Sequence, residues 1–223
     1  IGNEPHGPYH RPPLSKAYLK GTGGPDSLMF RPEKFYHDQK VDLISDRAVS
    51  IDRAARKVML ASGASLDYGH LVLATGARNR LLDIPNANLD GVRYLRTLDE
   101  SQALRDHIAP GQRVVVIGAG NTAMDALRVS RRLGAESVRC LYRRSRAEAP
   151  ARAEELHHAE EEGIEFHWLA SPVELLDDGK RNVCAVRCIR MTLGEPDASG
   201  RRRPVPEAGS EFEIEADMVV YAI

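Results

Sequence analysis

Short apolar runs alternate with helical patterns along the second half of the chain. Arg113–Ile117 (RVVVI) is almost continuously apolar, which is typical of a strand buried on both faces of a parallel sheet. Apolar positions then recur at helical spacing from Met124 until Gly134. The same alternation continues in three segments, predicted as strand, polar helix and strand: Ser137–Tyr142, 152–162 and 164–169. This order predicts the α/β class with a parallel sheet.

An antiparallel pattern follows near the end of the chain. Residues 173–176 and 183–191 predict a hairpin through Asp178-Gly179, and Phe212–Glu215 predicts another strand. Residues 194–204 are rich in turn formers and arginine, so we expect an exposed hairpin excursion there, with a partner or cofactor contact as the alternative. Residues 218–223 are apolar enough to predict a strand that belongs to the parallel sheet again.

The first half shows weaker periodicity. Its apolar positions predict strands at 41–44, 48–51 and 58–60, and a turn then leads to the apolar string 71–77 (LVLATGA). Near the start, Pro12-Pro13 predicts a short helix that ends near Gly21.

A glycine motif joins the strand Arg113–Ile117 to the helix after it. The string Gly118-Ala119-Gly120-Asn121-Thr122-Ala123 follows the strand directly. Gly118 permits a tight turn, Gly120 lets a pyrophosphate approach the backbone, and Ala123 allows close packing of helix and strand. The helix N-terminus offers free N–H groups and a positive dipole end to phosphates. The motif therefore predicts a Rossmann-like dinucleotide site, with a purely structural turn as the alternative.

The end of the next strand indicates which dinucleotide fits. A site for NAD usually has an acidic residue there, which accepts a hydrogen bond from the ribose 2′-hydroxyl. This chain has Arg143 and Arg144 instead. Guanidinium groups bind a 2′-phosphate that a carboxylate would repel. The arginine pair favours NADPH over NADH, and a solvated basic loop is the alternative.

Composition excludes several other classes of function. The formal net charge of −1 argues against nucleic acid or an anionic membrane as a partner, and no apolar run is long enough to span a bilayer. No signal peptide is visible, so we expect a cytoplasmic protein. Cys140, Cys184 and Cys188 form no redox or iron–sulfur spacing, and we expect them to be small buried hydrophobes. The adjacent His157 and His158 face different sides of a helix, so we predict surface residues and no metal site.

The second half resembles a known group of NADPH-binding domains. The strings GAGNTAMD, YRRSR, PAR, EEGIEF and LGEPDASGRRRPVP are similar to the NADPH domain of the glutamate synthase small subunit and to the related module of dihydropyrimidine dehydrogenase. The resemblance implies that residues 111–223 form an NADPH-binding Rossmann-like domain. It places the pyrophosphate at Gly118, Gly120 and Asn121 and the 2′-phosphate at Arg143 and Arg144.

The first half resembles the flavin domain of rubredoxin and ferredoxin reductases, in the strings PYHRPPLSKAYL, LVLATGAR and GVRYLRTLDE. Together the two halves are similar to the pyridine nucleotide-disulfide oxidoreductase superfamily, which uses FAD and NAD(P)H. The resemblance implies that Arg11 lies beside the FAD diphosphate or ribityl chain. It further implies that Thr75-Gly76 forms the crossover at which the chain runs past the flavin. It also implies that Lys16 lies near the reactive flavin nitrogen. Asp125 stands where many such reductases have a glutamate, so we expect a Lys16–Asp125 pair near the site of hydride transfer.

Two departures from that pattern shape the expected domain organisation. The superfamily's first βαβ unit, with the glycine motif for the FAD pyrophosphate, would precede Ile1, and its closing segment would follow the last residue. We therefore expect an internal piece of a longer flavoprotein: residues 1–110 as a partial FAD-binding-type domain with weak or absent FAD binding, and residues 111–223 as the NADPH domain.

Three functions from different classes are compatible with these features. The leading hypothesis is a flavin-dependent oxidoreductase that passes hydride from NADPH to FAD and electrons to an acceptor. That acceptor would be a ferredoxin or rubredoxin, or a glutamate synthase-type subunit. The second is a module that holds NADPH without turnover. The third is an interaction protein whose Rossmann-like unit is structural.

Overall fold

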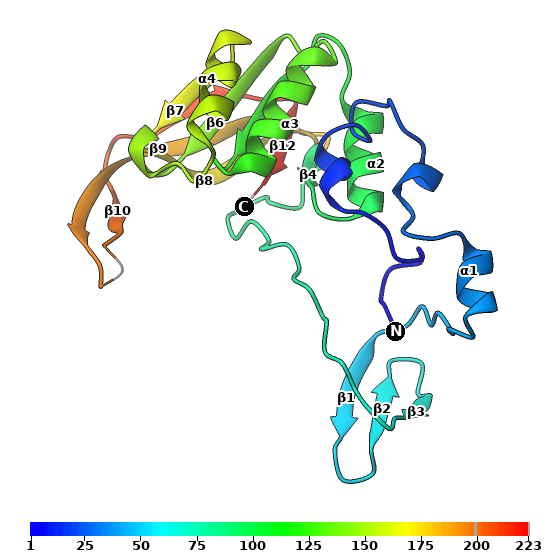
Figure 1. Ribbon diagram of the computed structural model, residues 1–223. Coiled ribbons are helices and arrows are strands. Elements are labelled where there is room, and N and C mark those ends of the chain that lie inside the picture. Colours follow the sequence, from blue (N-terminus) through cyan, green and yellow to red (C-terminus); the bar gives the residue numbers. More distant parts are fainter. Residues whose placement is uncertain (199, 223) are drawn as a thin grey trace. The chain divides into compact units, whose positions relative to one another are not determined.

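A computed structural model describes residues 1–198 and 200–222, which divide into two compact units. The smaller unit combines Ile1–Arg11 with Gly24–Arg78, and the larger combines Pro12–Gly23 with the chain from Asn79 onwards (Figure 1). This division differs from the boundary expected at 110/111, because the segment just before residue 110 supplies a strand and a helix to the larger unit. The limits of the two cofactor domains stay a prediction.

The centre of the larger unit is a five-stranded parallel sheet in the order β4-β12-β5-β6-β7. Its strands are β4 (Val92–Tyr94), β5 (Arg113–Ile117), β6 (Ser137–Tyr142), β7 (Glu165–Trp168) and β12 (Met218–Tyr221). The prediction that the last apolar run returns to the parallel sheet is confirmed, since Val219 pairs with Val92 on one side and Val115 on the other. The predicted end of that strand, residue 223, lies outside the described residues.

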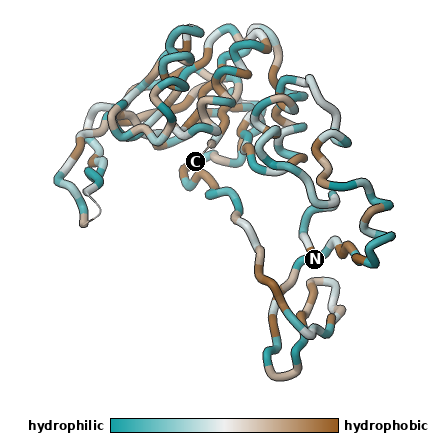
Figure 2. The backbone as a smooth tube through the Cα atoms, viewed as in Figure 1, coloured by the Kyte–Doolittle hydropathy of each residue, from teal (hydrophilic) through white to brown (hydrophobic). Residues whose placement is uncertain are grey.

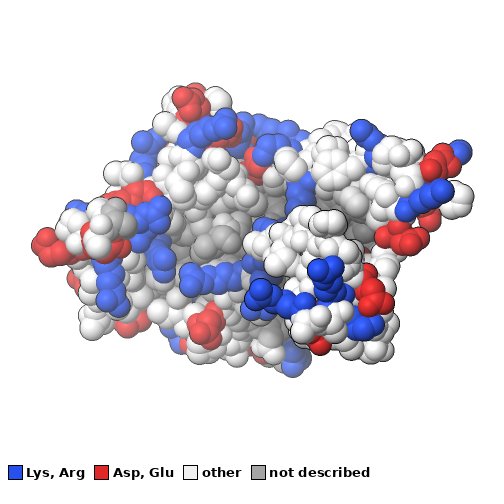
Figure 3. Space-filling model, turned by 60° about the horizontal axis from the view of Figure 1, so that its bottom comes forward, with Lys and Arg blue, Asp and Glu red and all other residues white. Residues whose placement is uncertain are grey.

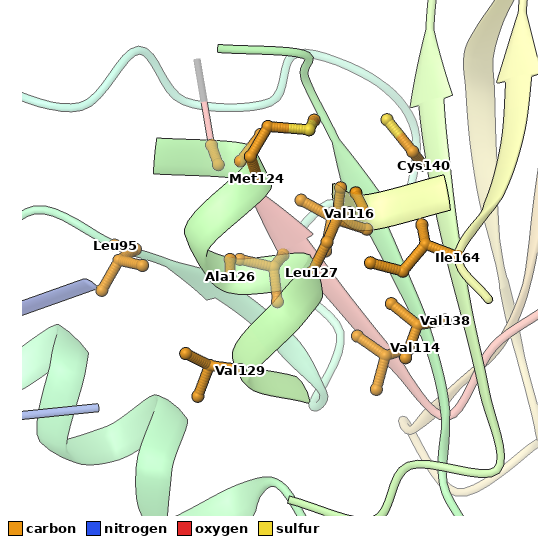
Figure 4. Packing of buried hydrophobic residues seen from close by; sticks show 14 of the residues in the cluster. Leu95, Val114, Val116, Met124, Ala126, Leu127, Val129, Val138, Cys140 and Ile164 are labelled. Carbon is orange, nitrogen blue, oxygen red and sulfur yellow. The ribbon is translucent and has the colours of Figure 1, made fainter. Parts of the chain in front are cut away.

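Three helices pack on one face of this sheet (Figure 1). They are α2 (Leu98–His107), α3 (Asn121–Arg132) and α4 (Ala153–Glu161). Figure 4 shows Val114 and Val116 of β5 among the side chains of α3, including the fully buried Leu127. Helix α2 begins with a capping box, in which the Thr97 hydroxyl accepts from the N–H of Glu100 and the Glu100 carboxylate accepts from the N–H of Thr97.

A second, antiparallel sheet covers the other face, where a separate apolar cluster forms around Val115, Leu175 and Val186. Its strands are β8 (Ala170–Asp177), β9 (Val183–Pro196), β10 (Arg202–Pro206) and β11 (Phe212–Glu215). The predicted hairpin is confirmed, as is its excursion, because β9 runs on past its pairing with β8 and β11 and then pairs with β10. Figure 3 shows blue and red side chains together at the end of this excursion, on the left.

The smaller unit contains a three-stranded antiparallel sheet and short helical segments. They are β1 (Ala48–Asp52), β2 (Lys57–Leu60), β3 (Ser65–Asp67), η2 (Pro25–Leu28) and α1 (Glu33–Asp38). The strand predicted at 41–44 is wrong: the Val41 N–H instead closes the end of α1 by donating to Tyr36, and Ile44 accepts from Gly2.

Two further segments depart from regular structure. The helix predicted from Pro12 to near Gly21 is a short 3-10 helix, η1 (Pro12–Ser15), followed by hydrogen-bonded turns up to Gly21, whose φ is +77°. Residues 70–82 form no helix or strand, and Val72 and Leu73 are 85% and 68% exposed. In Figure 2 this apolar stretch is the brown part of the tube that leaves the three-stranded sheet.

Candidate functional site

The glycine motif forms a tight turn between β5 and α3. Gly118 has a φ of +131°, a conformation that favours glycine, and its N–H donates to Leu141 of the neighbouring strand over 3.0 Å. Gly120 is the N-cap of α3, and Ala123 is fully buried where the helix meets the sheet. The sequence-predicted strand, turn and helix are therefore confirmed.

The start of α3 has the properties of an anion site. The N–H groups of Asn121, Thr122 and Ala123 have no acceptor within the helix, and its first turn contains no acidic residue. A Cβ at Gly120 would meet only the Cγ of Pro150, at 3.9 Å, so the protein leaves this backbone accessible. The turn fits the pyrophosphate of a dinucleotide.

Arg143 and Arg144 follow β6, the strand next to β5. They lie in a loop that is fixed by several hydrogen bonds. The short helix η3 (Arg146–Glu148) begins with a capping box, in which Ser145 and Glu148 bond to each other. This hydrogen bond from the Ser145 hydroxyl is the main reason why the pKa of Glu148 lies below its usual value. In addition, Arg144 accepts from the N–H of Leu169 over 3.0 Å. The loop holds both arginines at the carboxyl end of the sheet.

The two guanidinium groups are suited to an anionic ligand. Arg143 is exposed. Burial raises the pKa of Tyr221 at the end of β12, and the positive charge of Arg143 acts in the opposite direction. The Nε of Arg144 is buried and has no hydrogen-bond partner within the described chain. A buried donor without a partner is costly, and a phosphate oxygen would satisfy it once the Arg144 side chain turned to expose that atom. The residues present therefore fit the 2′-phosphate of NADPH.

A charged pair lies one turn further along α3. Lys16 and Asp125 form an ion pair, in which the lysine side chain is 58% exposed and the aspartate side chain 16% exposed. The buried Ser15 also donates its hydroxyl to Asp125 Oδ2, over 2.6 Å. The expected pair is thus present, although its role at a hydride-transfer site stays a prediction. Sequence reasoning missed Ser15, because no local pattern relates it to a residue 110 positions away.

The remaining candidates lie in the smaller unit. Arg11 forms an ion pair with Glu4, and its guanidinium lies over the ring of Tyr9, 5.0 Å from the centroid. Burial acts to raise the pKa of Glu4, but bonds from Tyr9 and Arg11 and the arginine charge lower it overall. Thr75 and Gly76 are exposed and outside regular structure, with a φ of +64° at Gly76. Their contacts with FAD stay predictions.

The family described as pyridine nucleotide-disulphide oxidoreductase matches residues 1–223. This chain belongs to that family.

Relatives and solved structures within this family agree with the resemblance found in the sequence. Rhodocoxin reductase from Rhodococcus erythropolis is 45% identical over 135 residues, which cover 60% of this chain and 32% of that protein. The glutamate synthase [NADPH] small chain of Azospirillum brasilense is 37% identical over 210 residues, which cover 87% and 43%. A ferredoxin reductase from Rhodopseudomonas palustris superposes with a TM-score of 0.81 at 43% identity, covering all of this chain and 52% of that one.

Membership of the family confirms the fold class and the oxidoreductase assignment, and the family implies the use of FAD and NAD(P)H. The chain spans about half or less of the length of these three proteins. What the whole protein reduces is therefore a matter for proposal, as are the roles of the individual site residues.

The cysteines and the adjacent histidines of the described residues form no further candidate site. Cys140 and Cys188 are buried and Cys184 is half-buried, all three as free thiols, and burial raises the pKa of Cys188 to about 12. His157 and His158 are exposed. Within residues 1–198 and 200–222, no group of three or more potential ligands could hold a metal ion. In the same residues no helix has both the length and the apolar character needed to cross a membrane.

Proposed function

We propose that this chain binds NADPH at the turn between β5 and α3 and belongs to a flavin-dependent oxidoreductase. Hydride would pass from NADPH to FAD, and electrons would go on to a protein or domain acceptor. The arrangement that carries the proposal is the glycine turn that opens α3 beside Arg143 and Arg144, which follow the adjacent parallel strand at the same edge of the sheet.

The residues of this chain would bind and orient the two cofactors, with little acid–base chemistry of their own. Gly118, Gly120 and the first N–H groups of α3 would hold the pyrophosphate, and Arg143 and Arg144 the 2′-phosphate. FAD, when bound, supplies the ring that accepts hydride. Lys16 would place a positive charge near that ring, and Asp125 would fix its ammonium group.

The acceptor and the setting are part of the same proposal. The names rhodocoxin reductase, ferredoxin reductase and glutamate synthase small chain support a ferredoxin-like carrier or a glutamate synthase-type subunit as the partner. The cytoplasmic location stays a prediction from the sequence.

Binding without turnover is the second candidate. It requires only the NADPH site described above. Flavin absorbance in the purified chain would favour the leading proposal, because binding without turnover needs no bound FAD.

The decisive experiment compares NADPH and NADH by calorimetric titration of the purified chain. We expect saturable binding with preference for NADPH. Replacing both Arg143 and Arg144 by alanine should weaken NADPH at least about tenfold and leave NADH nearly unchanged, since only NADPH carries the 2′-phosphate. The matched control replaces Arg131 and Arg132 by alanine. Both lie in the last turn of α3, away from the glycine turn.

The result that would contradict the assignment is equal affinity for the two nucleotides in the unmodified chain. If neither nucleotide binds, the structural role of the Rossmann-like unit becomes the better account.

A further inference from the structure

A short segment just before α4 lies across the glycine turn. The N–H of Ala151 donates to Ala119 over 3.0 Å, and the N–H of Arg152 donates to the side-chain Oδ1 of Asn121 over 3.2 Å. The ring of Pro150 faces the bare backbone of Gly120. These contacts fix the backbone of Arg152 beside the first residue of α3, more than thirty positions away in sequence.

The side chain of Arg152 differs from those of two nearby arginines, Arg128 and Arg146. Arg146 is paired with Glu160, and Arg128 with Glu155 and Glu162. Arg152 is exposed, and its guanidinium forms no ion pair or hydrogen bond with the part of the chain that the structure describes. Two backbone N–H groups thus form hydrogen bonds that hold this segment, whereas the Arg152 guanidinium has no partner among the described residues.

The bond to Asn121 also directs that side chain. Because Oδ1 accepts from Arg152, the amide group of Asn121 is left with its NH₂ donors. Together with the unpartnered N–H groups at the start of α3, the turn presents donors and a cation and, in the first turn of that helix, no carboxylate.

We propose that Arg152 is a phosphate-binding residue of this site and contacts the pyrophosphate, the part that NADPH and NADH share. This inference rests on the proposed function, since it assumes that a dinucleotide occupies the turn. Arg143 and Arg144 lie after β6 and would recognise the 2′-phosphate, whereas Arg152 is tied to α3. A guanidinium can form two parallel bonds to phosphate oxygens, which an ammonium group cannot match.

The two sets of arginines therefore have different signatures in binding experiments. Arg152→Ala should weaken NADPH and NADH by the same factor, about tenfold or more, because a hydrogen bond between charged groups is lost from both. Arg152→Lys should recover part of the affinity for both. Arg143→Ala with Arg144→Ala should affect NADPH alone. Arg146→Ala removes one positive charge from the same loop and should change neither affinity.

The measurement is calorimetric titration of the full chain with each nucleotide, together with unfolding in urea. Because the Arg152 side chain is exposed and unpaired, we expect the free energy of unfolding of Arg152→Ala to match the unmodified chain. Unchanged binding of both nucleotides would overturn the inference, and so would a loss confined to NADPH, which would assign Arg152 to the 2′-phosphate. If the unmodified chain binds neither nucleotide, the proposed function itself fails and the inference fails with it.

Discussion

At the scale of single residues, Gly91 shows how tightly the larger unit is packed. Its φ is +91°, and a Cβ there would lie 2.7 Å from Val183 Cγ1 and 2.9 Å from the carbonyl oxygen of Asp217. We expect Gly91→Ala to lower the free energy of unfolding by about 3 kcal/mol, from overpacking and from the left-handed backbone together. Urea unfolding of the purified chain measures it.

Gly179 provides the matched control for that substitution. Its φ is +83°, but a Cβ there would meet nothing within 4 Å. Gly179→Ala should therefore cost only the conformational part, about 1 kcal/mol. Equal losses for the two variants would mean that close packing around Gly91 is not the cause.

The site residues differ in how visible they are in the sequence. Gly118 and the arginine pair follow predicted strands directly, so local pattern located them. Ser145 and Glu148 have the spacing of a capping box, a signal that the sequence analysis did not use. Ser15 and Arg152 lie in strings that carry the family resemblance, but their contacts with distant helices follow from no local pattern.

At the scale of elements, one ion pair joins the start of β5 to the turn before β12. The Arg113 guanidinium donates to both oxygens of Asp217, over 3.0 Å and 2.6 Å, and also pairs with Glu215. The bonds from Arg113 are the main reason why the pKa of Asp217 lies below its ordinary value of 3.8. The pair therefore stabilises the fold most when the carboxylate is ionised.

This pair predicts a pH dependence of stability. A carboxyl group with a lowered folded pKa contributes fully above its unfolded pKa, and the contribution is lost as the pH falls through the folded value. Asp217→Asn should thus lower the free energy of unfolding at pH 7, and the difference from the unmodified chain should shrink as the pH falls below about 4. Chemical unfolding at several pH values measures it.

Glu215→Gln serves as the comparison, because the Glu215 side chain is 74% exposed and makes a single contact with Arg113. An exposed pair of this kind contributes little. A difference for Asp217→Asn that stayed constant from pH 7 to pH 3 would contradict the assignment.

At the scale of the whole molecule, the chain enters the larger unit twice. Residues Pro12–Gly23 belong to that unit although the next part of it begins at Asn79. Leu19 is fully buried in the same cluster as Leu104 of α2, and the Ser101 hydroxyl donates to Leu14 over 2.6 Å. An early segment of the chain is thus part of the core around α2 and α3.

This arrangement predicts that a chain cut near the end of the smaller unit stays together. A specific protease site placed in the exposed residues 71–77 should yield two fragments that elute as one species in size-exclusion chromatography, because Pro12–Gly23 remains packed in the larger unit. Leu19→Asp should release the early fragment by placing a charge in that core. Separation of the fragments without this substitution would show that the segment is not held as described.

The sequence by itself determined the strand, glycine turn and helix around residue 118, the arginine pair, the hairpin near Asp178-Gly179 and the family. These depend on local periodicity, on the backbone freedom of glycine and on motifs within short segments. Only the tertiary structure decided that β4 joins the parallel sheet, that residues 41–44 are not a strand, and that Ser15 joins the expected Lys16–Asp125 pair. It also decided that Arg152 lies at the start of α3. Each of these depends on which distant segments bury one another, a choice made by packing of the whole chain and not by any local pattern.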